Sequence, residues 1–508
     1  MEYISTRGQT APVSSAQAIA KGIAPDGGLF VPGALPRLGA ADLATAPAAD
    51  LAALAAMDYR GTARDILGRF LTDFRPTEIG ACVDAAYTAA KFGSDAIAPL
   101  RALGADTDLL ELWHGPTCAF KDMALQILPH LVVESLRKAG DRSELVILVA
   151  TSGDTGKAAL EGFRDVAGTK VVVFYPSGGV SEIQRLQMVT QEGRNVHAIG
   201  VDGGDFDDAQ RGVKAIFGDS GFRARCAAKG FELSSANSIN WGRLVPQICY
   251  YFWAYSRLVA AGRLSPGAKA NVAVPTGNFG NILAAWYARE MGLPIARLVC
   301  ASNENRVLAD FFGSGVYDRN RALRKTMSPS MDIVVSSNLE RLLFELHGHD
   351  PEPVRRWMES LGREGRYEVD PATRAGIDSA FWGAECGEAE TLATIGDVWR
   401  RHHYVVDTHT AVAVNALAKY REATGDGTPA IVVSTASPFK FNGSVVEGIF
   451  GRDAVAGKSE FELQLLLERD CGIPVPESLR GLRDKSVLHR GSCQPAGMAD
   501  AVAQALGL

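Results

Sequence analysis

The feature that most constrains the fold of this chain is a set of short apolar segments that end in small or polar residues. Glu144–Ala150, Lys170–Tyr175, Asn271–Pro275 and Ala430–Ser434 are segments of this kind. Strands that are covered on both faces of a parallel sheet read as continuous apolar runs. Helical patterns follow these runs, so the sequence predicts an α/β fold with a doubly wound sheet.

Size and composition narrow the class of protein further. The chain has 508 residues, is 47% hydrophobic and can bury a large core in two or three domains. Its formal net charge of −6 gives no reason to expect a nucleic acid or an anionic membrane as a partner. The eight cysteines form no CxxC pair, and neither a signal sequence nor a membrane-spanning run is visible. We therefore expect a cytoplasmic protein with reduced thiols.

One lysine lies between a loop and an apolar helix, in the segment HGPTCAFKDMALQ at His114–Gln126. A lysine amine bonds to an aldehyde only where it is held close to that aldehyde and partly desolvated. Phe120 and Met123 provide such surroundings, so Lys121 is a candidate Schiff-base lysine. The alternative is a lysine at a helix start that extends to solvent.

A glycine-rich turn follows the buried run Asn271–Pro275 and precedes a helical pattern. Such turns direct backbone N–H groups to one point, and the helix start adds partial positive charge, so the unit suits a phosphate. The alternative is a turn whose glycines serve geometry alone. The candidate phosphate-binding residues are Thr276, Gly277, Asn278, Phe279, Gly280 and Asn281.

A hydroxyl follows the last buried run, in the segment VSTASPFKF that contains Thr435 and Ser437. A hydroxyl at a strand end can bond the nitrogen of a heteroaromatic ring and leaves that nitrogen largely neutral. We favour Thr435 over Ser437 for this contact. The alternative is a hydroxyl that only satisfies the end of the strand.

A second strand–turn–helix unit has the sequence TSGDTGK at Thr151–Lys157. A Walker loop would need glycine in place of Thr151 and a hydroxyl residue in place of Ala158, so that interpretation fails. Asp154 could cap the next helix, and this role is compatible with anion binding by the loop.

The ordered motifs resemble those of one family over nearly the whole chain. They are YISTRG, DGGLFVP, HGPTCAFKDMALQ, TSGDTGKAA, SSANSINWGRLVPQICYY, PTGNFGN, SPSMDI and VSTASPFKF. Together they resemble the threonine synthases of the bacterial and fungal type, which are pyridoxal-phosphate enzymes of the tryptophan-synthase-β fold. The resemblance implies fold type II with two doubly wound lobes. We expect an N-terminal domain at 1–95, a cofactor-binding core at 96–345 with a smaller mobile lobe at about 125–250, a helical insertion at 346–400, and the rest of the core at 401–508.

The resemblance also implies a reaction, in which O-phospho-L-homoserine and water give L-threonine and phosphate. Lys121 would hold pyridoxal phosphate and move protons. By resemblance, Ser152, Asp154 and Thr155 belong to the loop for the substrate's α-carboxylate. Our candidates for the leaving phosphate are Lys157, Asn240 and Arg243, with Lys440 a weaker one. Relatives of this type are often monomers, so we expect a monomer or a weak homo-oligomer.

Two other functions remain open at this point. One is a serine or threonine dehydratase, or a phospholyase acting on another phosphorylated amino acid; YISTRG and SANSINWGR argue against it. The other is a cofactor-free relative, against which the intact Lys121 argues. Asn281 and Ser437 depart from the family's frequent aspartate and histidine. The adjacent His402 and His403 on an expected strand would face opposite ways, so we expect no metal site there.

Overall fold

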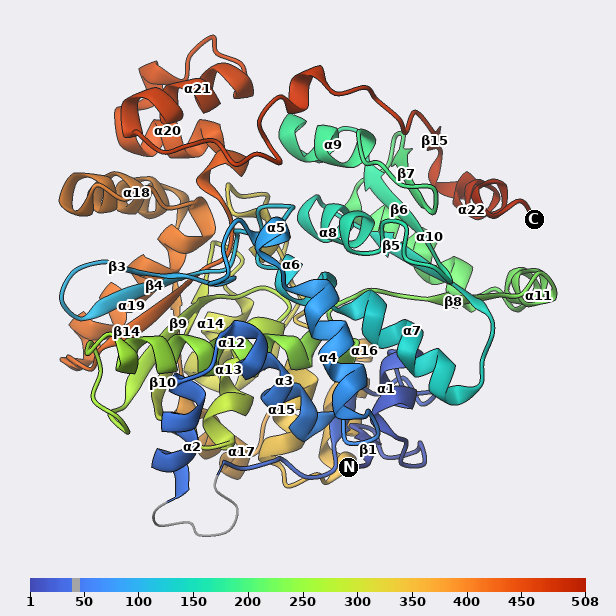
Figure 1. Cartoon of the computed structure of the whole chain (residues 1–508), viewed down its shortest axis with the longest axis horizontal. Helices are drawn as coiled ribbons and strands as arrows, with labels where there is room; N and C mark the ends of the chain where they lie inside the picture. The colour runs from blue at the N-terminus through green and yellow to red at the C-terminus, as the bar shows by residue number, and fades with distance from the viewer. Residues whose placement is uncertain (39–45) are drawn as a thin grey trace.

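Two sheets form the centre of the molecule in the computed structural model, which describes residues 1–38 and 46–508 (Figure 1). The larger sheet has six strands in the order β13-β10-β9-β14-β4-β3. Its strands are parallel except for β3, which runs antiparallel to β4. The bounds are β3 Leu100–Ala102, β4 Thr107–Glu111, β9 Ala270–Pro275, β10 Ile295–Ser302, β13 Phe381–Glu385 and β14 Ala430–Ser434.

The smaller sheet has five parallel strands in the order β15-β7-β6-β5-β8. They are β5 Glu144–Ala150, β6 Thr169–Pro176, β7 Val196–Val201, β8 Phe231–Ser234 and β15 Ser492–Cys493. The last part of the chain crosses from the larger lobe to place β15 beside β7 (Figure 1). The expected α/β fold with parallel sheets is confirmed.

Both faces of the smaller sheet are buried, which explains its apolar runs. Ile147 and Val149 of β5 belong to the main core, while the alternate residues Val146 and Leu148 pack in a second core with the side chains of α10 and α22. Alternation of side chains along a strand produces this division. The helices of this lobe are α8 Asp154–Gly162, α9 Glu182–Val189, α10 Phe206–Gly218, α11 Ser220–Ala228 and α22 Met498–Leu506.

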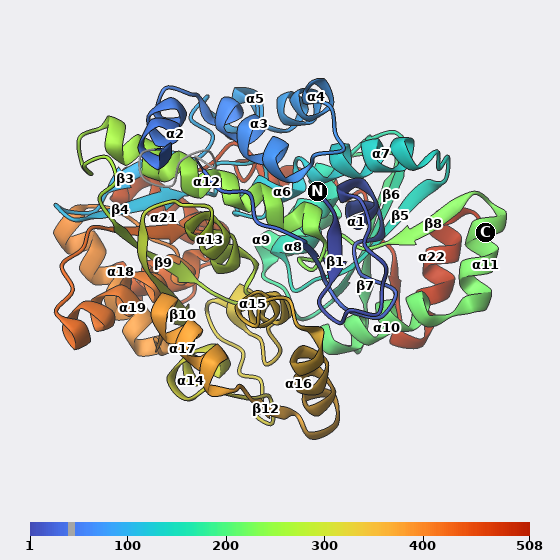
Figure 2. The ribbon, with the colours of Figure 1, turned by 90° about the horizontal axis from the view of Figure 1, so that it is seen from below.

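The N-terminal elements pack along the long helix α12 (Trp241–Ala260), and Figure 2 shows α2 to α5 gathered on one side of it. Residues Tyr3–Ser5 form β1, which pairs antiparallel with β2. The bounds are β1 Tyr3–Ser5, α1 Ser15–Lys21, β2 Phe30–Pro32, α2 Ala46–Ala55, α3 Tyr59–Phe70, α4 Pro76–Ala86 and α5 Ala89–Phe92.

The remaining elements surround the larger sheet, and Figure 2 shows α14, α16 and α17 on the side opposite α2 to α5. The helices are α6 Asp122–Leu125, α7 Leu128–Ala139, α13 Gly280–Glu290, α14 Val307–Ser314, α15 Leu339–Leu346, α16 Pro351–Glu364, α17 Pro371–Ala380, α18 Glu388–His402, α19 Thr408–Thr424, α20 Asn442–Phe450 and α21 Glu460–Cys471. The short strands β11 Val316–Asp318 and β12 Arg366–Glu368 pair antiparallel. The 3₁₀ turns are η1 Pro329–Met331, η2 Pro438–Lys440, η3 Arg452–Ala454, η4 Leu482–Asp484 and η5 Pro495–Gly497.

Two expectations for the C-terminal half differ from the structure. The range 346–400 is not a purely helical insertion, because β13 within it pairs with β10 at the edge of the six-stranded sheet. His402 and His403 do not lie on a strand: His402 ends α18, and His403 takes a left-handed conformation with φ of 47°. Hydrophobic pattern alone could not separate an edge strand from its flanking helices.

Within residues 1–38 and 46–508, no helix is long and apolar enough to cross a membrane. Within the same ranges, no group of three His, Cys, Asp or Glu side chains is placed to hold a metal ion.

Candidate active site

Three of the segments singled out in the sequence follow neighbouring parallel strands. The lysine loop follows β4, Thr435 follows β14, and Thr276 follows β9. The strands β4 and β14 are in register from their first residues to Glu111 and Ser434. Because the carboxyl ends of parallel strands meet at one edge of a sheet, the three segments lie together, and ligands of α/β proteins bind at such an edge.

Backbone hydrogen bonds fasten the lysine loop to the end of β14. The N–H of Phe120 donates to the carbonyl of Thr435 at 2.8 Å, and the N–H of Ser437 donates to the carbonyl of Cys118 at 3.0 Å. Between them, Ala119 and Ala436 form an isolated antiparallel bridge. Thr435 is therefore held next to the residue that precedes Lys121.

Lys121 lies in a partly buried position at the start of α6. Its Nζ is 3.4 Å from Ser330 Oγ and 4.8 Å from the centre of the Phe120 ring. Burial lowers the pKa of Lys121 to about 8; the negative charge of Asp154 opposes this shift, and the positive charges of Arg243 and Lys440 add to it. At pH 7 about a tenth of the amine is therefore neutral, far more than for an exposed lysine, and a Schiff-base lysine requires this neutral form.

The glycine-rich turn presents backbone N–H groups without acceptors. Gly280 and Asn281 occupy the first turn of α13, where amides have no intrahelical acceptor. The N–H groups of 277–281 have no acceptor in the described part of the chain. A Cβ on Gly277 would come within 2.5 Å of the carbonyl oxygen of Ser330, so only glycine fits beside the Ser330 segment that also contacts Lys121.

Neighbouring side chains hold this turn from several sides. Asn338 Nδ2 donates to the carbonyl of Asn278 at 2.9 Å, and Ser336 Oγ donates to the carbonyl of Gly277 at 2.8 Å. The Tyr250 hydroxyl donates to Asn281 Oδ1 at 2.6 Å, while Asn281 Nδ2 is buried without a partner. Hydrogen bonds to the carbonyl groups hold the turn in place, and its backbone N–H groups are left free to bind a ligand.

The two hydroxyls after β14 have different surroundings. Ser437 caps the 3₁₀ turn η2 (Pro438–Lys440), where its Oγ accepts from the N–H of Phe439 at 3.4 Å. Thr435 is buried, and its hydroxyl has no hydrogen-bond partner in the part of the chain that the structure describes. The free hydroxyl belongs to Thr435, the residue that the sequence favoured.

Comparisons with known proteins agree with this arrangement. Family models match at residues 2–87 ("Threonine synthase N terminus"), 99–388 ("Pyridoxal-phosphate dependent enzyme") and 410–485 ("Threonine synthase, C-terminal"). The threonine synthase of Pseudomonas aeruginosa is 39% identical over 89% of this chain and 91% of its own. The chain belongs to the threonine synthase family. It is a pyridoxal-phosphate-dependent lyase of fold type II.

Solved structures give the same assignment. The chain resembles pyridoxal-phosphate-bound threonine synthase from Brucella melitensis, with a TM-score of 0.86, 35% identity and 99% of each chain covered. It resembles the yeast threonine synthase with a TM-score of 0.87 and 32% identity, covering 100% of this chain and 99% of that one. Human threonine synthase-like 1 is 38% identical over 91% of this chain, which spans 61% of that protein.

The residues at the sheet edge fit pyridoxal phosphate. The open amides of 277–281 suit its phosphate, the amine of Lys121 its aldehyde, and the free hydroxyl of Thr435 its ring nitrogen. The contacts through Ser330 and Phe120 hold these three parts close together.

The turn after β5 differs from the expected arrangement in the role of Asp154. The helix α8 is capped by Thr151, whose Oγ1 accepts from the N–H groups of Gly153 and Gly156 at 3.0 and 2.8 Å. Asp154 is the first residue of α8, and the alternative role of its side chain as a cap of this helix is not observed. Its carboxylate instead contacts Lys440 Nζ at 2.5 Å and accepts from Gln184 Nε2 at 2.9 Å.

The proposed substrate residues fall into two groups. Ser152, Asp154 and Thr155 share the turn after β5, as adjacent sequence positions require, and Ser152 and Thr155 are partly exposed. The other three have structural partners. Lys157 pairs with Glu161 at 3.2 Å, Asn240 caps α12 through Gly242 and donates to the carbonyl of Ile19, and Arg243 donates to the carbonyl of Ala236. Arg243 Nε is buried and has no partner within residues 1–38 and 46–508, and burial lowers the pKa of Arg243 to about 10.

Sequence reasoning identified neither Ser330 nor His409 as a residue of the site. Ser330 Oγ lies between Lys121 Nζ at 3.4 Å and Asp154 Oδ2 at 3.5 Å. His409 Nε2 accepts from the N–H of Ser330 at 3.2 Å, while its Nδ1 bonds Asp407 Oδ1 at 2.9 Å. The motif SPSMDI marked the Ser330 segment, but nothing in it revealed a contact with a lysine 209 positions earlier.

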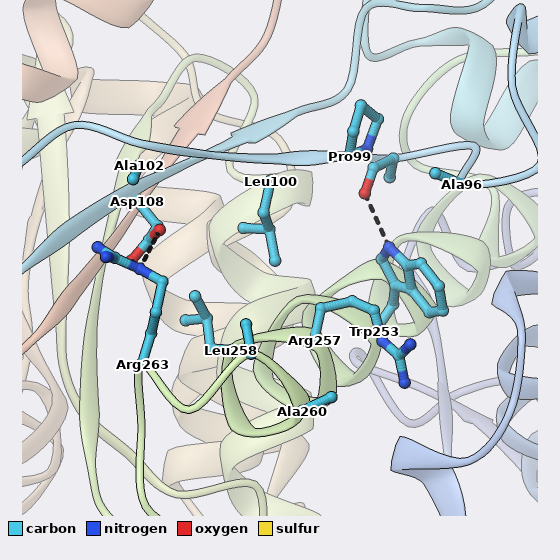
Figure 3. A pocket seen from close by; sticks show the side chains of 12 residues that line it. Ala96, Pro99, Leu100, Ala102, Asp108, Trp253, Arg257, Leu258, Ala260 and Arg263 are labelled. Carbon is cyan, nitrogen blue, oxygen red and sulfur yellow. Dashed lines mark hydrogen bonds and ion pairs between the residues drawn. The ribbon is translucent and has the colours of Figure 1, made fainter. Parts of the chain in front are cut away.

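A cavity of about 590 Å³ lies elsewhere, between the β3–β4 edge and the end of α12 (Figure 3). Trp253 Nε1 donates to the carbonyl of Ala98 at its rim, and Arg263 pairs with Asp108. None of the candidate site residues lines it.

Proposed function

We propose that this chain converts O-phospho-L-homoserine and water to L-threonine and phosphate. The observation that carries the proposal is the meeting of Lys121, the open amides of 277–281 and the free hydroxyl of Thr435 at one sheet edge. The matches to threonine synthases from end to end of the chain support the choice of substrate. We further propose that the enzyme acts in the cytoplasm as a monomer or a weak homo-oligomer.

The chemistry requires protons to move at three carbons. The substrate loses protons from Cα and Cβ, phosphate leaves Cγ, the hydroxyl of water adds at Cβ, and protons return to Cγ and Cα. Pyridoxal phosphate, when bound, supplies an aldehyde for the substrate amine and a ring that accepts electrons from Cα. Lys121, with a pKa near 8, is suited to take and return the proton at Cα near neutral pH.

The remaining residues hold the substrate. The amides of Asp154 and Thr155 are in the first turn of α8 and therefore lack intrahelical acceptors, which suits an α-carboxylate. Among the cations, Arg243 lowers the pKa of Lys121 most, ahead of Lys440. Its buried Nε, which has no partner among the described residues, suits the departing phosphate. Lys157 and Asn240 would have to leave their present partners to bind the phosphate.

The test is an assay of the purified protein with O-phospho-L-homoserine, in which phosphate, L-threonine, ammonia and 2-oxo acid are all measured. We expect phosphate and threonine in equal amounts, and neither from the Lys121→Ala variant. Phosphate accompanied by ammonia and a 2-oxo acid instead of threonine would identify a phospholyase. Human threonine synthase-like 1 is almost as similar as the bacterial synthase, so the product analysis decides between these reactions.

A further inference from the structure

The turn after β5 contains one group that opposes the binding of an anion, the carboxylate of Asp154. This side chain is 3% exposed and lies in the same turn as the open amides of α8. An unpaired carboxylate there would repel a substrate carboxylate, because charges interact strongly where water is excluded. The structure pairs this carboxylate with a lysine from the other lobe.

Lys440 provides the compensating charge. Its side chain is completely buried, and its Nζ lies 2.5 Å from Asp154 Oδ1 and 3.1 Å from the carbonyl oxygen of Thr117. Thr117 belongs to the lysine loop, where its N–H and hydroxyl donate to Asp122 at 2.8 and 2.7 Å. One ammonium group thus connects the turn after β5 with the loop that holds Lys121.

Two neutral donors also contact Asp154, and the charge of Lys121 acts on it. Gln184 Nε2 donates to its Oδ1 at 2.9 Å and Ser330 Oγ to its Oδ2 at 3.5 Å. Lys440 and Lys121 hold the pKa of Asp154 well below its usual range despite burial, which by itself raises that pKa. The aspartate is therefore ionised, and its charge is matched by Lys440.

We propose that Lys440 and Asp154 are positioning residues for the substrate's α-carboxylate. Lys440 cancels the charge of an aspartate that would repel the carboxylate, and the pair fixes the open amides of α8 relative to Lys121. Both side chains are too deeply buried to be reached by the substrate, so they act through the turn. The inference rests on the proposed function, because it assigns the turn after β5 to the substrate of that reaction.

The test compares Lys440→Met with Lys440→Arg and with the double variant Lys440→Met/Asp154→Asn. The control is Lys419→Met, because Lys419 also pairs with a carboxylate, Glu390 at 2.7 Å, and donates to a backbone carbonyl, that of Glu385. Binding is followed by the visible absorption of the holoenzyme during titration with L-threonine, and in parallel with L-threoninol, which lacks the carboxylate. Thermal unfolding of each variant shows whether it folds.

We expect Lys440→Met to weaken L-threonine binding by about tenfold to a hundredfold, as is typical when one partner of a buried ion pair is removed. L-threoninol binding should change little. The double variant and Lys440→Arg should recover most of the loss, and Lys419→Met should bind both compounds as the wild type does. Equal losses for L-threonine and L-threoninol, or no recovery in the folded double variant, would overturn the inference.

The pH dependence gives an independent readout. The titratable groups that face Asp154 are Lys440, Lys121 and the thiol of Cys118. Without Lys440, burial of Asp154 is opposed by fewer positive charges and its pKa is higher than in the wild type. Acidification should therefore neutralise Asp154 more readily in Lys440→Met and strengthen L-threonine binding by this variant relative to the wild type. If the affinities of Lys440→Met and of the wild type for L-threonine kept a constant ratio as the pH changed, the charge argument would be contradicted.

If the wild type released no threonine from O-phospho-L-homoserine, the proposed function would fail. The comparison of L-threonine with L-threoninol binding would still test this inference.

Discussion

The turn after β9 and the turn after β5 both lead from a buried parallel strand into a helix whose first amides lack acceptors. The first is held by neutral hydrogen bonds to its carbonyls from Asn338 and Ser336. The second is held through the buried ion pair of Asp154 and Lys440, which joins the two lobes. A turn fixed within one lobe suits a resident cofactor, and a turn held across two lobes suits a substrate that enters and leaves.

Asn338 shows how firmly the first turn is anchored. It contacts Arg341, a fully buried residue whose Nε donates to the carbonyl of Phe30 at 3.0 Å and whose Nη2 donates to that of Ile239 at 2.6 Å. The N-terminal β-strands, the segment before α12 and the cofactor turn are therefore connected through one guanidinium. Charged donors make stronger hydrogen bonds than neutral ones, so this anchor is difficult to displace.

The largest expected effect comes from substitution of Lys121. Lys121→Ala removes the amine that bonds the cofactor aldehyde and moves the proton at Cα, so turnover should fall by about 10³-fold or more. The protein should lose the borohydride-sensitive absorption of the cofactor while its unfolding temperature without cofactor stays near that of the wild type. Residual turnover within tenfold of the wild type would show that another group does this chemistry.

A pair of glycine substitutions separates the two turns. Gly277→Ala places a Cβ 2.5 Å from the carbonyl oxygen of Ser330 and should weaken cofactor binding by about tenfold or more, as overpacking does. Gly153→Ala is strained at φ of +139° and meets the Gln184 side chain, so it should keep the cofactor and raise the KM for substrate. Equilibrium dialysis with pyridoxal phosphate and steady-state kinetics measure the two effects.

The control for these glycines is Gly178→Ala, because no atom lies within 4 Å of the Cβ that it would add. It should change neither cofactor affinity nor KM. Loss of cofactor from Gly153→Ala, with Gly277→Ala unaffected, would reverse the roles assigned to the two turns.

A third prediction concerns the pKa of the Lys121 amine. In the cofactor-free protein, burial lowers the pKa of Lys121 to about 8, so roughly one amine in ten is neutral at pH 7. The rate of covalent capture of pyridoxal phosphate should rise about tenfold per pH unit up to pH 8 and then level off. Asp154→Asn should move this midpoint to lower pH, because the Asp154 charge raises the pKa of Lys121. A rate that rises steadily to pH 10 would indicate an exposed, ordinary lysine.

The sequence predicted local structure better than it predicted side-chain contacts between residues that are far apart in the chain. The strand at Glu144–Ala150 has the predicted limits, because its apolar run records burial on both faces. Asp407 caps α19 through the N–H groups of His409 and Thr410, which are contacts between neighbouring positions that local sequence can indicate. The ion pair of Asp154 was not predicted, because its partner Lys440 lies 286 positions later, where no local pattern can indicate the contact.

The same limit applies to the substrate candidates. Arg243 and Asn240 have suitable side chains, but their partners Ala236 and Ile19 became visible only in the folded chain. Lys157 pairs with Glu161, four positions later on the same helix. Lys440, which the sequence ranked below them, lies in the centre of the site. A residue type indicates what chemistry is available, whereas the fold decides which groups are already engaged.

The smallest expected effect distinguishes the two hydroxyls after β14. Thr435→Ala should retain the covalently bound cofactor and slow turnover by about tenfold or less, because a neutral ring nitrogen loses one hydrogen bond but no charge partner. Ser437→Ala removes only the cap of η2, so it should lower the free energy of unfolding by about 1 kcal/mol and leave kcat unchanged. Steady-state kinetics with urea unfolding of both variants measures the difference. If Ser437→Ala slowed turnover and Thr435→Ala did not, the ring nitrogen would be assigned to Ser437, and the free hydroxyl of Thr435 would have to serve the substrate.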